Sequence, residues 1–351
     1  MGLFSGEEAL CIIALVAALV AVLVVVCARR APSSSCVLDA ATATIFVTVP
    51  SYRDPKCRKT LHSMFANARH PGSVYAGVYE QNADGAERCL VEERFAPNVR
   101  TVSVHASAAT GPCTARYECA RLLRAEDVYL QVDSHTEFAR DWDVIAVQML
   151  LDEPSAREGR SVLSTYPVNC GSGWHERDPP VIDGVRYSGA WFLFNATMRA
   201  DARRAHAPSL QVGGGFLLCL ASVVRRVELD PHLAGLFNHE ELLYTARLYT
   251  HGIDVLAPTR CIVCHDYAYG EHRSVWSDNP GWNRHTGGAR RADALLRGTH
   301  PEQTARYGMG TARSLDDFWR RIGVDYAGKT TVTVTASASP SRPGPSPPRG
   351  R

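Results

Sequence analysis

Asp133 and His135 are the two residues whose types and spacing point most directly to chemistry. They lie in VYLQVDSHTEF, residues 128–138, just after five residues typical of a buried strand. Residues two apart on an extended segment point to the same side, so this carboxylate and this imidazole can share one divalent ion. Such a mixed pair suits Mn²⁺, with Mg²⁺ and Zn²⁺ as alternatives. Two protein ligands are too few for a structural site, but they suit an ion that also binds a substrate's phosphates.

A third metal ligand must come from elsewhere in the chain, and His265 is the candidate. It ends the apolar run RCIVCH, residues 260–265. Two strand ends at the same edge of one sheet would bring His265 close to Asp133 and His135. In the simpler alternative, Asp133 caps a turn and His135 packs without binding anything.

The segment CIVCH, residues 261–265, also matches the c-type haem attachment pattern. The pattern ends a strand-like run instead of opening a helix, which disfavours haem. A zinc hydrolase would need three protein ligands and an activated water, and the Asp133–His135 spacing is unlike the His-Glu-x-x-His pattern of such enzymes. We therefore expect Cys261 and Cys264 to be small core residues and His265 to face outward.

Two loops and one helix carry candidate contacts to a nucleotide. In PSYRDP, residues 50–55, Ser51 and Arg53 could hydrogen-bond a uridine or its phosphates and Tyr52 could stack on the base. The alternative is a turn set by the Asp-Pro pair. Arg116 could pair with a diphosphate. Gly214, in VGGGF (212–216), would allow close backbone approach to a ligand, and the alternative there is a plain flexible turn.

Glu240 and Glu241 are the candidate catalytic carboxylates. They open a helix predicted over residues 240–250, with Asn238 as N-cap, Glu241 completing a capping box, and Gly252 ending the helix. The two carboxylates either only favour the positive end of this helix, or one of them points at the acceptor or the sugar.

The elements that must position these residues alternate between strands and helices. The patterns predict strands at 44–49, 73–80, 99–104 and 128–132, and helices at 55–68 and 111–124. This alternation predicts an α/β fold with a parallel, doubly wound sheet. Ligands of such sheets bind at the carboxyl ends of the strands, which is where Asp133 and His135 fall.

The two ends of the chain differ from this folded part. Residues 9–28 are uncharged and long enough to span a bilayer, and no Lys or Arg precedes them, which disfavours a cleaved signal peptide. We expect an N-terminal tail (1–8), a transmembrane helix (9–28), a stem (29–43), a catalytic domain (44–326) and a disordered tail rich in Ser, Thr and Pro (327–351).

Charge limits the partners and the topology. The net charge is +2 and the arginines are scattered, so nucleic acid is not an expected partner. Glu7 and Glu8 precede the apolar run, and Arg29 and Arg30 follow it, which places the body on the cytoplasmic side. Anchored sugar transferases of the secretory pathway usually have the opposite arrangement, and Asn195 begins one glycosylation acceptor pattern. The eleven cysteines permit disulfides without requiring them.

Several segments together resemble the GlcNAc-transferase family, whose best-known members add N-acetylglucosamine to hydroxyproline on a cytoplasmic ubiquitin-ligase adaptor. The match spans about 44–272 and rests on VTVPSYRDPKCRKTLHSMFANA, GPCTARY, YLQVDSHTEF, WDVIAVQ and HEELLYTARLYTHGIDVLAPT. The resemblance implies a GT-A type nucleotide-sugar transferase fold, Rossmann-like, with UDP-GlcNAc as donor, a Mn²⁺-like ion and retention of the anomeric configuration. The chain is more distantly similar to the polypeptide GalNAc-transferases. This similarity implies that Asp133, His135 and His265 are the metal ligands. His239 stands where the family usually has Gly.

The sequence thus predicts a membrane-anchored, metal-dependent retaining glycosyltransferase. It would move N-acetylglucosamine from UDP-GlcNAc to a protein, at hydroxyproline or Ser/Thr, or to a glycan. The alternative is a catalytically inactive nucleotide-sugar or glycan-binding protein on the same fold.

Overall fold

The computed structural model describes residues 38–86, 88–171, 173–268, 273–281 and 286–331. The predicted N-terminal tail (1–8), the predicted transmembrane helix (9–28) and most of the predicted stem lie outside these ranges. Within them, no helix is both long enough and apolar enough to cross a membrane.

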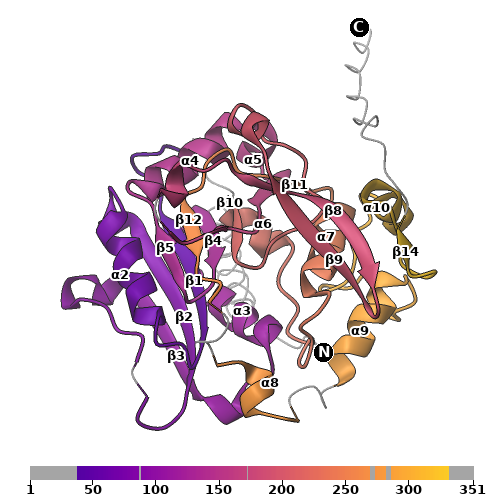
Figure 1. Cartoon of the computed structure of the whole chain (residues 1–351), viewed down its shortest axis with the longest axis horizontal. Coiled ribbons are helices and arrows are strands. Elements are labelled where there is room, and N and C mark those ends of the chain that lie inside the picture. The colour runs from indigo at the N-terminus through magenta and orange to yellow at the C-terminus, as the bar shows by residue number, and fades with distance from the viewer. Residues whose placement is uncertain (1–37, 87, 172, 269–272, 282–285, 332–351) are drawn as a thin grey trace, which may run out of the picture. The chain divides into compact units, whose positions relative to one another are not determined.

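A seven-stranded sheet forms the centre of the domain (Figure 1). Its strands, in spatial order, are β11 (Asp254–Leu256), β6 (Ser161–Ser164), β10 (Phe216–Leu220), β4 (Val128–Val132), β1 (Ile45–Tyr52), β2 (Val74–Asn82) and β3 (Val99–His105). Only β10 runs antiparallel to its neighbours, β4 and β6. The prediction of a mostly parallel sheet is therefore confirmed, and the four strands predicted in the first half are all present.

The central strands are apolar along their length because they are buried on both faces. Every residue of β4 is buried, and so are the first five residues of β1. Parallel strands covered on both sides read as continuous apolar runs, which is why these strands are visible in the sequence. β3 at the sheet edge alternates between half-buried and exposed side chains.

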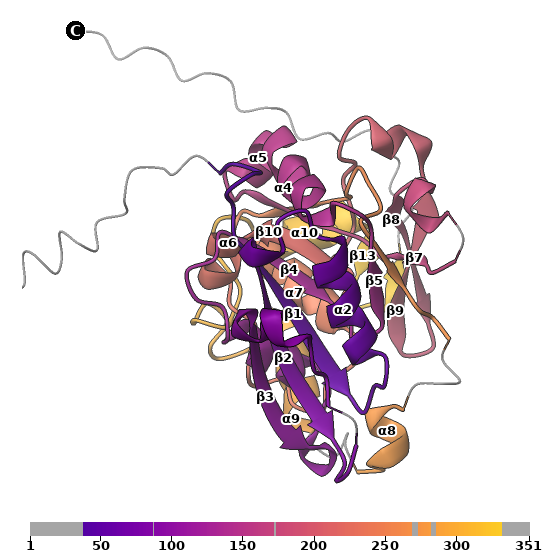
Figure 2. The same cartoon turned by 90° about the vertical axis from the view of Figure 1, so that its left-hand side faces the viewer.

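Helices pack on the sheet and beside it (Figure 2). They are α2 (Cys57–Asn67), α3 (Pro112–Ala120), α4 (Trp142–Asp152), α5 (Pro154–Arg157), α6 (Ala221–Arg226), α7 (Glu240–Thr250), α8 (Val275–Asp278), α9 (Thr286–Leu296) and α10 (Leu315–Ile322). α3 contacts β1 and β2. A Cβ on Gly77 of β2 would lie 3.1 Å from the Cys119 carbonyl oxygen of α3, so the absence of a side chain there permits close packing.

Three smaller sheets complete the domain. One has the order β5 (Thr136–Phe138), β12 (Val263–His265), β7 (Val168–Asn169), and another is the hairpin of β8 (Pro180–Ser188) and β9 (Trp191–Met198). The third pairs β13 (Val324–Asp325) with β14 (Thr330–Thr331). The sequence placed the end of the catalytic domain at residue 326, and β14 lies just beyond that boundary.

Within the described ranges, two disulfides connect distant parts of the chain. Cys57 is bonded to Cys89, and Cys170 to Cys264. Cys264 is buried, as expected of a core residue, but its sulfur is in this second disulfide and is not a free thiol. Cys261 is a free, buried thiol, as expected. The other free cysteines in the described ranges are also buried: Cys113, Cys119 and Cys219.

Candidate active site

Asp133 and His135 lie on the short turn that joins β4 to β5. The prediction that they share an extended segment is wrong, because the chain turns at Ser134 and His135. The turn is fixed from α2, where the Thr60 hydroxyl donates to the Ser134 carbonyl at 2.7 Å and accepts from the Thr136 amide at 2.9 Å. The turn, and not strand geometry, brings the carboxylate and the imidazole to one side.

His265 reaches this turn from a different sheet. It ends β12, which pairs antiparallel with β5, so that His265 lies opposite Thr136. The expectation that His265 lies at the edge of the same sheet as Asp133 is wrong. It is close to the turn because the strand that follows His135 is its direct neighbour.

The ligand atoms of Asp133, His135 and His265 all lie within 4.8 Å of one another. The two Nε2 atoms of the histidines are 2.9 Å apart, and Nε2 of His265 is 3.2 Å from Oδ2 of Asp133. One carboxylate oxygen and two imidazole nitrogens are therefore close enough to one another to bind the same ion. The predicted trio is brought together, and its role in metal binding remains a prediction.

Asp54 supports this cluster from behind, and the sequence analysis missed it. Its Oδ2 lies 2.7 Å from Nδ1 of His135 and accepts from the Ser134 hydroxyl at 2.6 Å. Burial raises the pKa of Asp54, but the bonds from His135 and Ser134 outweigh it and hold the pKa below its usual value. An ionised Asp54 accepts a hydrogen bond from the Nδ1–H of His135, so that Nε2 of His135 faces the cluster. Asp54 belongs to the PSYRDP segment, where the Asp-Pro pair indicated only a turn.

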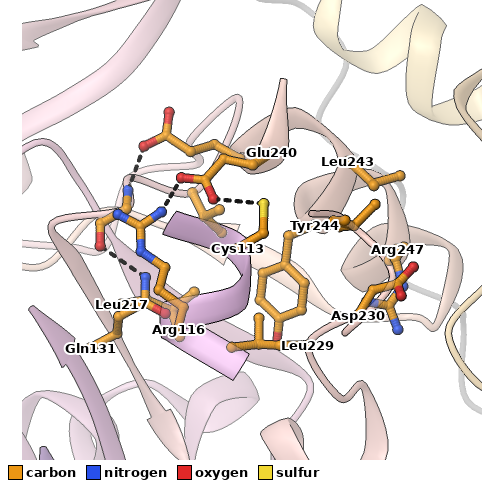
Figure 3. A pocket seen from close by; sticks show the side chains of 14 residues that line it. Cys113, Arg116, Gln131, Leu217, Leu229, Asp230, Glu240, Leu243, Tyr244 and Arg247 are labelled. Atoms are coloured by element: carbon orange, nitrogen blue, oxygen red, sulfur yellow. Dashed lines mark hydrogen bonds and ion pairs between the residues drawn. The ribbon is translucent and has the colours of Figure 1, made fainter. Parts of the chain in front are cut away.

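Arg116 of α3 holds Asp133 from the other side. Its guanidinium contacts Oδ1 of Asp133 at 3.3 Å and forms an ion pair with Glu240 (Figure 3). Glu240 also accepts from the Cys113 thiol at 3.2 Å. Burial raises the pKa of Asp133, but the hydrogen bond from His265 and the charge of Arg116 outweigh it and hold the pKa well below its usual range. Asp133 is therefore ionised at neutral pH.

Glu241 is held by three donors of the protein itself. It accepts from the Gly214 amide at 2.5 Å, the Tyr166 hydroxyl at 3.1 Å and the Gln211 side-chain amide at 3.0 Å. Burial and the charge of Glu240 raise its pKa to about 7. Both predicted catalytic carboxylates thus have protein partners, and a catalytic role for them remains a prediction.

The cluster opens into a cavity of about 680 Å³, which we call the main cavity. Asp133, His135, His265, Glu240 and Glu241 line it, together with Arg116. Gly111 and Pro112, at the N-terminal end of α3, also face it. A volume of roughly 300–1,000 Å³ is typical of small-molecule sites. Aromatic side chains, which the sequence analysis did not single out, complete its rim: Tyr166, Trp191, Phe192, Phe237 and Trp276.

The three residues predicted to bind a nucleotide near position 52 differ in their surroundings. Tyr52 lines the main cavity, and its hydroxyl donates to Asp278 at 3.2 Å. Ser51 is a buried residue of β1 and does not line the cavity. Arg53 forms an ion pair with Asp278 at 2.7 Å and does not line the cavity either. Of the three, only Tyr52 lies where a nucleotide in the main cavity could contact it.

Gly214 makes room for Arg116. A Cβ on Gly214 would lie 2.4 Å from a guanidinium nitrogen, and the residue lies outside the lining of the main cavity. The neighbouring Gly215 does line it, and its Cβ would lie 3.2 Å from Oδ2 of Asp133 and 3.5 Å from the His265 ring. The glycine run lets protein side chains approach the backbone closely, and Gly215 is the residue beside the cluster. Approach of a ligand to Gly214 remains a prediction.

His239, and not Asn238, is the N-cap of α7. Its φ of +69° lies in the left-handed region, and its side chain makes no capping bond to the helix. The predicted capping box at Asn238 and Glu241 is wrong, because the Glu241 carboxylate is occupied by Gly214, Tyr166 and Gln211. The predicted helix end at Gly252, where φ is +82°, is confirmed.

The cluster fits a divalent cation. A carboxylate oxygen with two imidazole nitrogens is a usual donor set for Mn²⁺ or Zn²⁺, and Asp54 supplies the carboxylate that orients a metal-binding histidine. His265 lacks such support among the described residues, since its buried Nδ1 has no hydrogen-bond partner there.

The sequence model of the Glycosyltransferase (GlcNAc) family matches residues 44–98 and 91–328. The chain belongs to this family. Membership agrees with the α/β architecture and the mostly parallel sheet, and it identifies a glycosyltransferase. No curated protein sequence matches the chain.

Solved structures of low sequence identity resemble this family member. The crystal structure of GalNAc-T7 with UDP, GalNAc and Mn²⁺ matches with a TM-score of 0.47 at 16% identity, covering 81% of this chain and 56% of that one. The mannosyltransferase PcManGT from Pyrobaculum calidifontis, in complex with GDP-Man and Mn²⁺, matches at 0.41 and 17%, covering 70% and 65%. TarS of S. aureus matches at 0.41 and 15%, covering 64% and 37%. The chain thus spans little more than half of the GalNAc-T7 chain that it matches.

Proposed function

We propose that this protein is a metal-dependent, retaining glycosyltransferase that moves N-acetylglucosamine from UDP-GlcNAc to a protein or glycan acceptor. The observation that carries the proposal is the convergence of Asp133, His135 and His265 at the wall of the main cavity. UDP-GlcNAc as donor and retention of configuration rest on the family resemblance.

Each residue around the cluster has a specific task under this proposal. Asp133, His135 and His265 would hold a divalent ion, most suitably Mn²⁺, which when bound offsets the charge that develops on a departing diphosphate. Asp54 keeps Nε2 of His135 directed at the cluster. The N-terminal end of α3 faces the cavity and carries the positive end of the helix dipole, which favours a phosphate there.

Arg116 orients Asp133 and adds positive charge beside the place proposed for the diphosphate. Because Glu240 neutralises much of this charge, Arg116 acts mainly as a positioning residue. Direct pairing of Arg116 with the diphosphate would require its contact with Asp133 or Glu240 to be exchanged.

The second candidate is a catalytically inactive protein that binds a nucleotide sugar or glycan. The observation that favours it is that Glu240 and Glu241 already accept hydrogen bonds or ion pairs from other residues of the protein. Binding of UDP without any release of UDP from UDP-sugars would support this candidate.

UDP release from a panel of UDP-sugars, with and without Mn²⁺, tests the proposal. We expect release from UDP-GlcNAc to exceed release from UDP-GalNAc, UDP-glucose and UDP-galactose, and to require the ion. Equal release from all four sugars would contradict the proposed donor. Release that does not depend on a divalent ion would contradict the metal.

We also propose that residues 9–28 anchor the protein in a membrane, and that the catalytic domain faces an oxidising lumen. The charges around the apolar run favour the cytoplasm, but disulfides persist mainly in oxidising compartments, and two are present here. Carbonate extraction of cell membranes should leave the full-length protein in the membrane fraction. An endoglycosidase-sensitive glycan on Asn195 would support the lumenal side, whereas reduced cysteines at 57 and 89 in cells would contradict it.

A further inference from the structure

A second cavity of about 440 Å³ lies directly beside the main cavity. Residues from the turn of the β8–β9 hairpin, from the segment before α7, and from α9 line it. The ends of β8 and β9 and the helix α9 can be located in Figure 1. The two cavities share the side chains of one wall: Trp191, Phe192, Phe237, Asn238 and His239. Nothing in the proposed donor chemistry uses the second cavity.

His239 builds this shared wall. Its Nε2 accepts a hydrogen bond from the Phe192 amide at 3.0 Å, and its ring packs against Trp191 with centroids 5.2 Å apart. Burial lowers the pKa of His239 to about 4, so the neutral ring has the acceptor nitrogen that this bond needs. His239 therefore ties the β8–β9 hairpin to the start of α7.

The backbone of His239 has a conformation that Gly would adopt without strain. A φ of +69° is easy for Gly and uncommon for other residues. A Gly there would adopt the same backbone but could neither accept from Phe192 nor support Trp191. The wall between the two cavities therefore depends on the side chain of His239 and is not a requirement of the helix start.

The shared wall exposes aromatic surface that the fold does not cover. Trp191 is 42% exposed and Phe237 is 43% exposed. Exposed aromatic side chains grouped around a cavity mark ligand sites more often than ordinary surface. Flat aromatic rings suit the apolar faces of pyranose rings, which present C–H groups on one side and hydroxyls at the edge.

The remaining lining of the second cavity offers hydrogen-bonding groups of both kinds. Asp293 of α9 and Arg297, just after this helix, face it, and they are paired through Nε of Arg297 and Oδ2 of Asp293 at 2.9 Å. Asp293 also accepts from the Tyr326 hydroxyl at 3.1 Å. The pair places one guanidinium and one carboxylate at the cavity, and Lys329 adds one positive charge. Negative charges therefore do not outnumber positive charges in the lining. Neighbouring donors and acceptors beside aromatic rings match vicinal hydroxyls.

We propose that the second cavity is an acceptor subsite for a saccharide unit, and that His239 is the residue that positions its aromatic wall. This inference rests on the proposed function and narrows it, since it favours a glycan of at least two sugar units as the acceptor. One unit would lie in the main cavity next to the donor, and the next would lie in the second cavity.

Filling the second cavity tests the subsite without touching the main cavity. Ala289 is exposed on α9 and lines the second cavity but not the main one, so Ala289→Trp should occupy the space with little cost to folding. Arg290→Trp, at the exposed neighbouring position outside both linings, is the matched control. Binding is measured on the full-length protein by saturation-transfer NMR and titration, with lactose, cellobiose, mannobiose and diacetylchitobiose as probes.

We expect at least one disaccharide to bind, and Ala289→Trp to weaken it by about tenfold, a change readily measured by titration. The control variant should bind it normally, and both variants should bind UDP like the natural protein. Absence of disaccharide binding to the natural protein, or equal binding by Ala289→Trp, would overturn the subsite. Binding of a peptide rich in Ser, Thr and Pro that Ala289→Trp weakens instead would also overturn it.

Two variants of His239 test whether its side chain positions the aromatic wall for the saccharide or only stabilises the fold. His239→Asn tolerates a positive φ and offers a carbonyl oxygen to the Phe192 amide, whereas His239→Gly keeps only the backbone. We expect disaccharide affinity to fall in His239→Gly and to be partly restored in His239→Asn, with the thermal midpoints of the two variants similar. Equal affinities in the two variants would remove the positioning role. The two experiments fail independently. If the proposed function is wrong, the natural protein would release no UDP from UDP-sugars and could still bind the disaccharide.

Discussion

Nδ1 of His135 lies 2.7 Å from Oδ2 of Asp54, so that a buried carboxylate stands behind one of the two histidines of the candidate metal cluster. This contact decides which ring nitrogen faces the cavity. It also shows that the PSYRDP segment contributes to the site by supporting another residue.

Removing the Asp54 carboxylate should weaken the metal site without removing a ligand. We expect Asp54→Asn to lower Mn²⁺ affinity by roughly 10–100-fold, the usual cost of losing such an outer contact. Affinity can be measured by electron paramagnetic resonance of free Mn²⁺. Asp152→Asn, at an exposed carboxylate at the end of α4, should leave affinity unchanged. Normal affinity in Asp54→Asn would show that His135 is oriented by other contacts.

Removing a proposed ligand should have a larger effect. Asp133→Ala and His135→Ala should each reduce the rate of sugar transfer by about 10² or more, because each removes an electrostatic contact worth roughly 3 kcal/mol in the transition state. Circular dichroism should show an intact fold in both. Transfer at a normal rate by either variant would exclude that residue from the site.

The Cys170–Cys264 disulfide should control the position of His265. Cys264 precedes His265 on β12, and the Cys170 amide donates to the His265 carbonyl at 3.1 Å. The strands of this sheet have only two or three residues, too short to be stable alone. Replacing both Cys170 and Cys264 with serine should therefore lower the free energy of unfolding by about 2–5 kcal/mol. It should also lower the affinity for Mn²⁺.

The other disulfide provides the comparison. Replacing Cys57 and Cys89 with serine should lower stability by a similar amount with a smaller effect on Mn²⁺ affinity, because this disulfide does not join the strand of His265. Equal losses of metal affinity in the two double variants would mean that only general stability matters.

His265→Ala should impair both transfer and metal binding.

Glu241 should make stability depend on pH in a predictable direction. Burial and the charge of Glu240 raise its pKa in the folded protein to about 7, well above the usual value of a glutamate, so the folded state binds its proton more tightly than the unfolded state. Stability is then highest below the unfolded pKa and falls as pH rises to about 7, by an amount on the order of 3 kcal/mol. Urea denaturation from pH 4.5 to 8 should show this fall, reduced in Glu241→Gln. Parallel pH curves for the two proteins would contradict the raised pKa.

Much of the first half of the fold could be predicted because β1, β2 and β4 are mostly buried strands with many apolar residues. β3 was also found close to its true bounds, although its side chains are only half-buried or exposed. The β8–β9 hairpin was not found, because its exposed face mixes large apolar and polar side chains and its register shifts between Ile182 and Gly184.

The candidate metal ligands could be identified from residue types, although the geometry inferred for them was wrong. Asp133 and His135 are a recognisable pair in any conformation, whereas the turn between them depends on Thr60 of α2. The pairing of Cys170 with Cys264, 94 residues apart, has no local signal. Asp54 was missed for a related reason, since its partner lies 81 residues away.

Metal-dependent release of UDP from UDP-GlcNAc tests the central claim most directly. The full-length protein is stripped with chelator, and UDP is measured before and after Mn²⁺ is restored, beside Asp133→Asn treated in the same way. We predict no release from the stripped protein, full recovery with Mn²⁺, and little recovery in Asp133→Asn. Equal release with and without the ion, or full recovery in the variant, would contradict a metal site built on Asp133, His135 and His265.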